Sequence, residues 1–139
     1  MGMRQVTKIA GVILAGGKST RMGGGDKCLR LLAGRTLLDR AITRARLQVD
    51  ELLLNANGDA ARFTGTGLTI ISDTIENYAG PLAGILTALE WARDARPSCT
   101  HVVSFASDTP FFPTDLVAHL IRAAKEKQLP LACAASGGR

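Results

Sequence analysis

The feature that most constrains the fold is a continuous run of apolar residues near the start of the chain. Residues 9 to 15 read I-A-G-V-I-L-A, and glycines follow directly. A short apolar run without polar alternation is typical of a strand that is buried on both faces, and such strands belong to parallel sheets covered by helices. This run therefore predicts the first strand of a parallel sheet.

Strand and helix patterns then alternate along the rest of the chain. The pattern predicts further strands over Glu51–Asn57, Leu68–Ser72, His101–Ala106 and Leu131–Ala135, and helices over Thr36–Gln48, from Pro81 to about Arg93, and after Phe111. Strands that alternate with helices form a mainly parallel sheet with helices on both faces. The sequence thus predicts α/β architecture: one doubly wound, Rossmann-like, three-layer domain.

The length of 139 residues fits a single domain. Only four residues follow the last predicted strand, and no helix pattern covers it. We therefore expect residues 1–139 to form one domain that is incomplete at its C-terminus.

Composition and charge narrow the class of partner. Up to Ile70 the chain has 11 basic and 5 acidic residues, whereas the remainder has 6 and 7. A positive field concentrated in one half suits an anionic partner such as a nucleotide, a phosphorylated small molecule or a nucleic-acid backbone. Acidic residues interrupt the basic half, and six aromatic residues offer little for base stacking, so nucleic acid is disfavoured.

The same composition predicts a cytoplasmic protein. No apolar run approaches the roughly 20 residues that cross a bilayer, so no membrane association is expected. The three cysteines are far apart and odd in number, which disfavours both a disulfide framework and a structural zinc site. We expect reduced thiols.

The strongest functional signal is the glycine-rich stretch from Leu14 to Lys27, L-A-G-G-K-S-T-R-M-G-G-G-D-K. Glycines let the backbone approach a ligand closely, and successive N–H groups after a strand form an anion-binding nest. Lys18, Arg21 and Lys27 add the charge that neutralises a triphosphate. The stretch is not a P-loop, whose first glycine would have to replace Val12, and the dinucleotide pattern G-x-G-x-x-G is absent after this strand.

Polar residues also follow the other predicted strands, at the edge where doubly wound folds bind ligands. They are Asn55, Asp73 and Asp108. Asp108 follows a buried strand that would hold its carboxylate rigidly, and Mg²⁺ takes one or two carboxylates plus phosphate oxygens. Each residue also has a structural interpretation, because Asp and Asn commonly stabilise turns by bonding to nearby backbone.

Together these segments resemble the molybdenum cofactor guanylyltransferase family over nearly the whole chain. The glycine-rich stretch matches the nucleotidyltransferase signature L-x-G-G-x-x-x-R-M-G-x-x-K, with its last lysine one residue further out. The matching residues are Leu14 to Gly17, Arg21 to Gly23, Asp26-Lys27, Asn55-Ala56-Asn57, Asp73, Gly80-Pro81-Leu82-Ala83-Gly84 and Asp108-Thr109-Pro110.

The resemblance implies that GMP is transferred from GTP to the molybdopterin-bound molybdenum cofactor, with release of pyrophosphate. It implies nucleotide contacts from Leu14, Ala15, Gly16, Gly17, Lys27, Asn55, Asp73 and Asp108, catalytic roles for Arg21, Lys27 and Asp108, and Mg²⁺ held by Asp108. Such transfer depends on positioning and charge neutralisation, so no Ser, Cys or His nucleophile is required. Implied partners are GTP, the molybdenum cofactor, and proteins that insert or accept the cofactor.

Two alternatives stay open at this point. A related enzyme would use CTP in place of GTP. A truncated domain would bind the nucleotide without turnover.

Overall fold

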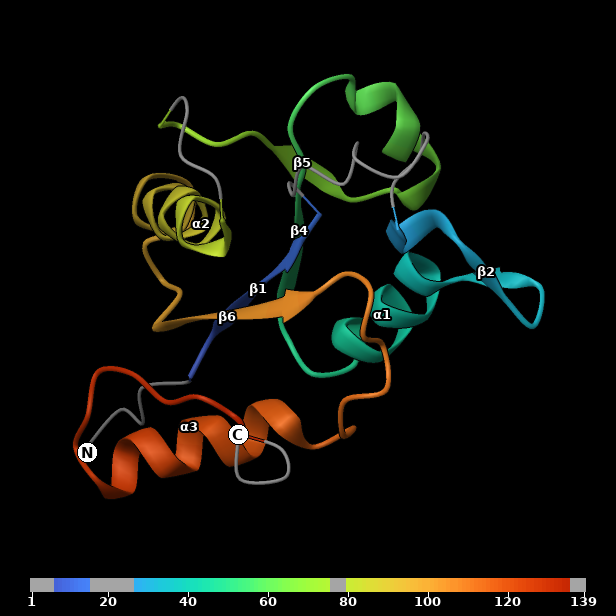
Figure 1. Cartoon of the computed structure of the whole chain (residues 1–139). Helices are drawn as coiled ribbons and strands as arrows, with labels where there is room; N and C mark the ends of the chain where they lie inside the picture. The colour runs from blue at the N-terminus through green and yellow to red at the C-terminus, as the bar shows by residue number, and fades with distance from the viewer. Residues whose placement is uncertain (1–6, 16–26, 76–79, 136–139) are drawn as a thin grey trace.

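The computed structural model describes residues 7–15, 27–75 and 80–135. Within these ranges a parallel sheet forms the centre of the molecule (Figure 1). Its strands are β1 (Ile9–Leu14), β4 (Glu51–Asn55), β5 (Thr69–Ile71) and β6 (His101–Ala106), in the order β5-β4-β1-β6. The first strand of the chain therefore lies between β4 and β6, as a strand buried on both faces should.

Helices cover both faces of this sheet. They are α1 (Leu37–Arg46), α2 (Pro81–Ala95) and α3 (Leu116–Glu126). Figure 1 shows α2 on one face and α1 with α3 on the other. Successive side chains of β1 point to opposite faces of the sheet, so each face has apolar residues for a helix to cover. Val12 packs in a cluster with Ala88 of α2, whereas Ile13 belongs to the larger cluster with residues of α1 and α3. The predicted three-layer α/β fold is confirmed.

Local signals explain where the helices begin. The Thr36 side chain accepts a hydrogen bond from the Asp39 N–H at 2.9 Å, which caps α1. Helix α2 begins with Pro81, whose missing N–H costs nothing in a first turn. Gly80 before it has a φ of 121°, a conformation that favours glycine.

Several short elements were not predicted. They are the helical turns η2 (Lys27–Leu29) and η3 (Ala60–Thr66) and a hairpin of β2 (Leu31–Leu32) and β3 (Arg35–Thr36). Two-residue strands carry no measurable periodicity, and the hairpin depends instead on positive φ values at Ala33 and Gly34. In η3 a single residue, Phe63, is 1% exposed and joins the core.

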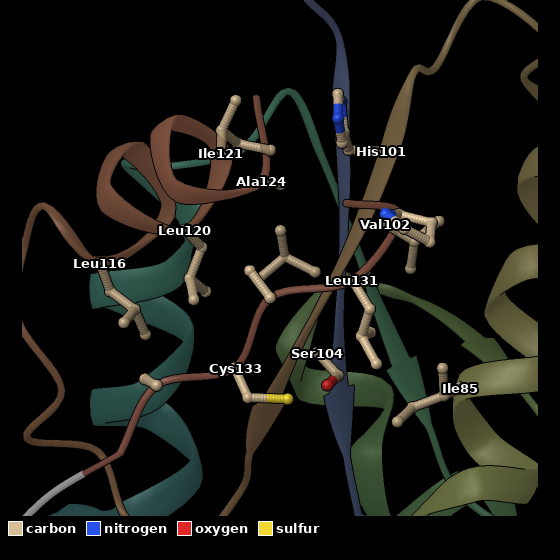
Figure 2. Close-up of a pocket in the computed structure, with 14 residues that line it drawn as sticks. Ile85, His101, Val102, Ser104, Leu116, Leu120, Ile121, Ala124, Leu131 and Cys133 are labelled. Atoms are coloured by element: carbon tan, nitrogen blue, oxygen red, sulfur yellow. The ribbon is translucent and has the colours of Figure 1, made fainter. Parts of the chain in front are cut away.

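The predicted strand over Leu131–Ala135 is wrong. These residues are irregular and pair with no described strand. They run beside β6, where Leu131 and Cys133 line a pocket with Ser104 (Figure 2). Three of the five residues are alanines, which favour strands weakly, so apolar character here reflects contact with β6 and not sheet pairing.

Candidate functional site

The ends of three parallel strands bring the predicted residues to one edge of the sheet. Leu14 lies opposite Asn55 of β4 on one side and Ala106 of β6 on the other. The Ala15 N–H donates to the Asn55 carbonyl at 2.8 Å, which continues the pairing past the end of β1. The structure therefore places Leu14, Ala15 and Asn55 side by side, with Asp108 two residues beyond β6.

A polar cluster of Asn55, Asn57 and Asp73 lies at the ends of β4 and β5. Asn55 Nδ2 donates to Asp73 Oδ1 at 2.8 Å, and Asn57 Nδ2 donates to Asp73 Oδ2 at 2.8 Å. The Asp73 N–H donates back to Asn57 Oδ1 at 2.9 Å. Two side chains from the end of β4 and the residues after it thus fix the Asp73 carboxylate, and Asn55 bonds across the sheet and not into a local turn.

Asn57 is a member of this cluster that the predicted site left out. The signal was present, since residues two apart in an extended chain share a face, and the sequence reads N-A-N. Asn55 is 3% exposed, whereas Asn57 and Asp73 are half-buried. The accessible members of the cluster are therefore Asn57 and Asp73, and each carboxylate oxygen of Asp73 has a further lone pair for donors of a base or ribose.

Helix α2 packs directly on this cluster through Gly84. A Cβ at position 84 would lie 2.8 Å from Leu14 Cδ2 and closer still to Asn55 Oδ1. Only glycine allows this approach, so the Gly80–Gly84 segment does provide the tight helix packing that the sequence suggested. The N-terminus of α2 begins at the same segment and has no side-chain cap among the described residues, and uncapped helix N–H groups bind anions.

Asp108 lies in an exposed turn between two buried residues, Ser107 and Pro110. No hydrogen bond or ion pair joins its carboxylate to any residue in the described ranges, so the turn-capping interpretation lacks the bond that it requires. Within those ranges there is also no group of three or more His, Cys, Asp or Glu side chains able to hold a metal. A lone exposed carboxylate suits Mg²⁺, which takes most of its remaining ligands from phosphate and water.

Lys27 begins η2 and is exposed, while the next residue, Cys28, is 3% exposed and belongs to the core cluster that includes α1. The buried thiol therefore anchors the turn that carries the lysine. Gly16, Gly17, Lys18 and Arg21 lie outside the described residues.

A sequence profile described as the MobA-like NTP transferase domain matches residues 11–139. The chain belongs to this family. Over 132 residues it is 52% identical to a molybdenum cofactor guanylyltransferase of Bradyrhizobium sp. strain ORS 278, which covers 95% of this chain and 62% of that protein. The chain thus spans about three fifths of the length of the curated relatives that it matches.

Two solved structures have the same fold as this chain. Rv0371C of Mycobacterium tuberculosis H37Rv, in complex with manganese, is 28% identical, with a TM-score of 0.62 over 86% of this chain and 61% of that one. CMP:2-keto-3-deoxy-manno-octonic acid synthetase, in complex with CTP, has a TM-score of 0.67 at 17% identity over 88% and 49%. The second likeness concerns the fold alone.

An apolar pocket in the described part of this domain is separate from the polar cluster. This pocket of about 370 Å³ lies between β6, α3, Ile85 of α2 and residues 130–134, and contains none of the predicted site residues (Figure 2). Its lining is mostly aliphatic, which does not suit a triphosphate.

No helix in the described ranges combines the length and apolar character that spanning a membrane requires.

Proposed function

We propose that this chain is the GTP-binding part of an enzyme that transfers GMP from GTP to the molybdopterin-bound molybdenum cofactor. The products are the cofactor's guanine dinucleotide and pyrophosphate. The observation that carries the proposal is the Asn55–Asn57–Asp73 cluster beside Leu14 and Ala15, in a chain 52% identical to a curated guanylyltransferase.

In this proposal the cluster recognises the nucleoside. The Asp73 carboxylate accepts hydrogen bonds from guanine or from ribose hydroxyls, and the two asparagine amides hold it in position. The backbone of Leu14 and Ala15 lines the nucleoside from β1. Guanine carries two adjacent N–H donors, which cytosine lacks in that arrangement, so an anionic acceptor favours GTP over CTP.

The phosphates would be bound by cations and backbone N–H groups. Lys27 stands at the end of the glycine-rich stretch and is exposed, and Gly16, Gly17 and Arg21 complete the phosphate site that the signature implies. The uncapped N-terminus of α2 provides further N–H groups near the same edge.

Asp108 fits a divalent cation, because its carboxylate is exposed, lies two residues beyond β6 and is not bonded to any described residue. Asp108 would hold Mg²⁺ together with phosphate oxygens, and the ion would neutralise charge on the triphosphate. The manganese complex of the Mycobacterium tuberculosis relative supports a divalent cation in this fold.

The chemistry that the chain must support is a displacement at the α-phosphorus of GTP. A terminal phosphate oxygen of the cofactor forms the new P–O bond, and the bond to the bridging oxygen breaks as pyrophosphate leaves. Fixed hydrogen-bond donors and cations stabilise the charge that develops, so we assign the catalytic contribution to Arg21, Lys27 and Asp108, and the positioning of the nucleoside to Asp73 and Asn55.

We place this reaction in the cytoplasm, where the exposed thiol of Cys133 would stay reduced. Proteins that insert or accept the finished cofactor are its expected partners.

The proposal is tested by incubating the protein with GTP, Mg²⁺ and the molybdopterin-bound cofactor and measuring pyrophosphate and dinucleotide formation. Asp108→Ala should reduce turnover at least a hundredfold, because one charge-stabilising ligand is lost. Asp115→Ala is the matched control, since that exposed aspartate pairs with His119 in α3. Turnover by the Asp108 variant at the rate of the control would refute the metal role.

A second candidate is a nucleotide-binding unit that needs further segments for turnover. It is favoured by one observation, that the chain spans 62% of the length of its relative. GTP binding without product formation by the chain would support it, and product formation would exclude it.

A further inference from the structure

Thr87 in α2 connects the helix to the backbone that carries Asp73. Its side chain is buried, with 4% of the residue exposed. Thr87 Oγ1 accepts a hydrogen bond from the Thr74 N–H at 3.2 Å and donates one to the Ala83 carbonyl at 2.8 Å. Because the only hydroxyl proton is used within the helix, a lone pair is left to face the Thr74 amide.

The hydrogen bond from Thr74 to Thr87 lies beyond the end of β5, where strand pairing has stopped. Strand β5 ends at Ile71, and Asp73 lies two residues beyond it. The Asp73 carboxylate and its own N–H are held from the β4 side by Asn55 and Asn57. From the α2 side, the amide of the next residue is held by Thr87, so the carboxylate is fixed between two elements.

The same face of α2 supports the rest of the cluster. Gly84, three residues before Thr87, lies against Asn55, and Glu90, three residues after it, accepts from Thr74 Oγ1 at 3.4 Å. Residues at positions 84, 87 and 90 therefore form a row along the helix, in which Gly84 lies against Asn55 of the polar cluster, and Thr87 and Glu90 bond to Thr74, the residue after Asp73. Thr87 is the buried member of this row that bonds to the backbone of the Asp73 segment.

We propose that Thr87 is a positioning residue for nucleotide selection, which rests on the proposed role of Asp73 in binding GTP. Removing the hydroxyl takes away the partner of the Thr74 N–H and leaves the Asp73 segment less firmly held by α2, to which the longer Thr74–Glu90 bond still joins it. A small displacement of the Asp73 carboxylate, which must meet two N–H donors of guanine, lowers the affinity for GTP, because hydrogen bonds depend on both distance and direction.

The test is calorimetric titration of GTP and ATP, with Mg²⁺, into the full chain and its Thr87→Val variant. Valine keeps the shape of threonine but removes the hydroxyl. We expect GTP affinity to fall by up to about tenfold, the size of effect that one lost hydrogen bond produces. The ratio of GTP to ATP affinity should fall with it, which a merely structural role would not change, and Thr87→Ser should restore both values.

Thr43→Val is the matched control. Like Thr87, Thr43 donates its hydroxyl proton to the carbonyl four residues earlier, at 3.0 Å, and accepts a hydrogen bond, here from the Arg35 guanidinium at 2.8 Å. Unlike Thr87, it lies on the exposed face of α1. This variant should keep the wild-type affinities. Any general effect of valine on a helix would appear in both variants.

A folded Thr87→Val protein with the GTP affinity and GTP-to-ATP ratio of the wild type would overturn the inference. If this variant does not fold, Thr87→Ala, which adds no atoms and favours the helix, is judged by the same criterion. A wild-type chain that does not prefer GTP would instead overturn the proposed function, and the positioning role with it.

Discussion

Replacement of Gly84 by alanine tests the contact between α2 and the polar cluster. The added Cβ would lie 2.8 Å from Leu14 Cδ2 and even closer to Asn55 Oδ1, so the helix or the Asn55 side chain must move. Overpacking of this kind costs about 1–3 kcal/mol. If Asn55 moves, it also loses its bond to Asp73, and leaving a buried polar group unsatisfied costs about 1–3 kcal/mol.

One effect acts in the opposite direction, because alanine is favoured over glycine inside a helix by about 1 kcal/mol. The packing and hydrogen-bond costs exceed that gain, and we expect a net loss of about 2 kcal/mol in the free energy of unfolding. Urea denaturation measures it. Gly65→Ala is the control, since a Cβ there would meet nothing within 4 Å and the change should stay within about 0.5 kcal/mol.

The reasoning would be refuted by a Gly84→Ala protein as stable as the wild type or more stable. That result would show that helix propensity decides the outcome and that α2 does not press on Asn55. A stable variant with unchanged GTP affinity would remove the Gly84 contact from the description of the site.

Two further predictions concern single side chains. Asp73→Asn replaces one acceptor oxygen by an N–H donor, which must then face the donor Asn55 Nδ2 or Asn57 Nδ2. We expect the free energy of GTP binding to weaken by about 1–3 kcal/mol, measured by calorimetry, while circular dichroism shows that the fold is retained. Burial raises the pKa of the Cys99 thiol, so less thiolate is present at pH 8 than for an ordinary cysteine. Iodoacetamide should therefore alkylate the exposed Cys133 before Cys99. Mass spectrometry that shows Cys99 modified as fast as Cys133 would contradict this prediction.

The sheet and its helices could be predicted because their signals are local. The continuous apolar run Ile9–Ala15 requires burial on both faces, and the apolar spacing of α1 begins where Thr36 caps the helix. The polar residues after the strands could be placed at one edge, because parallel strands end on the same side.

What could not be predicted depends on contacts between distant residues. Apolar residues at 131–135 look like a strand until their position beside β6 is known. The bonds from Asn57 to Asp73 and from Thr87 to Thr74 join elements whose relative placement the sequence does not encode locally. Gly84 could be expected to allow tight packing, but the side chain that makes glycine necessary, Asn55, is visible only in the structure.

The central claim is that the edge formed by Leu14, Asn55, Asn57 and Asp73 selects a guanine nucleotide. The most direct test is calorimetric titration of GTP, CTP and ATP into the chain, with and without Mg²⁺. We predict that GTP binds most tightly, by at least tenfold, and that Mg²⁺ strengthens its binding. Equal affinity for the three nucleotides, or tighter binding of CTP, would contradict the assignment of this edge to guanine.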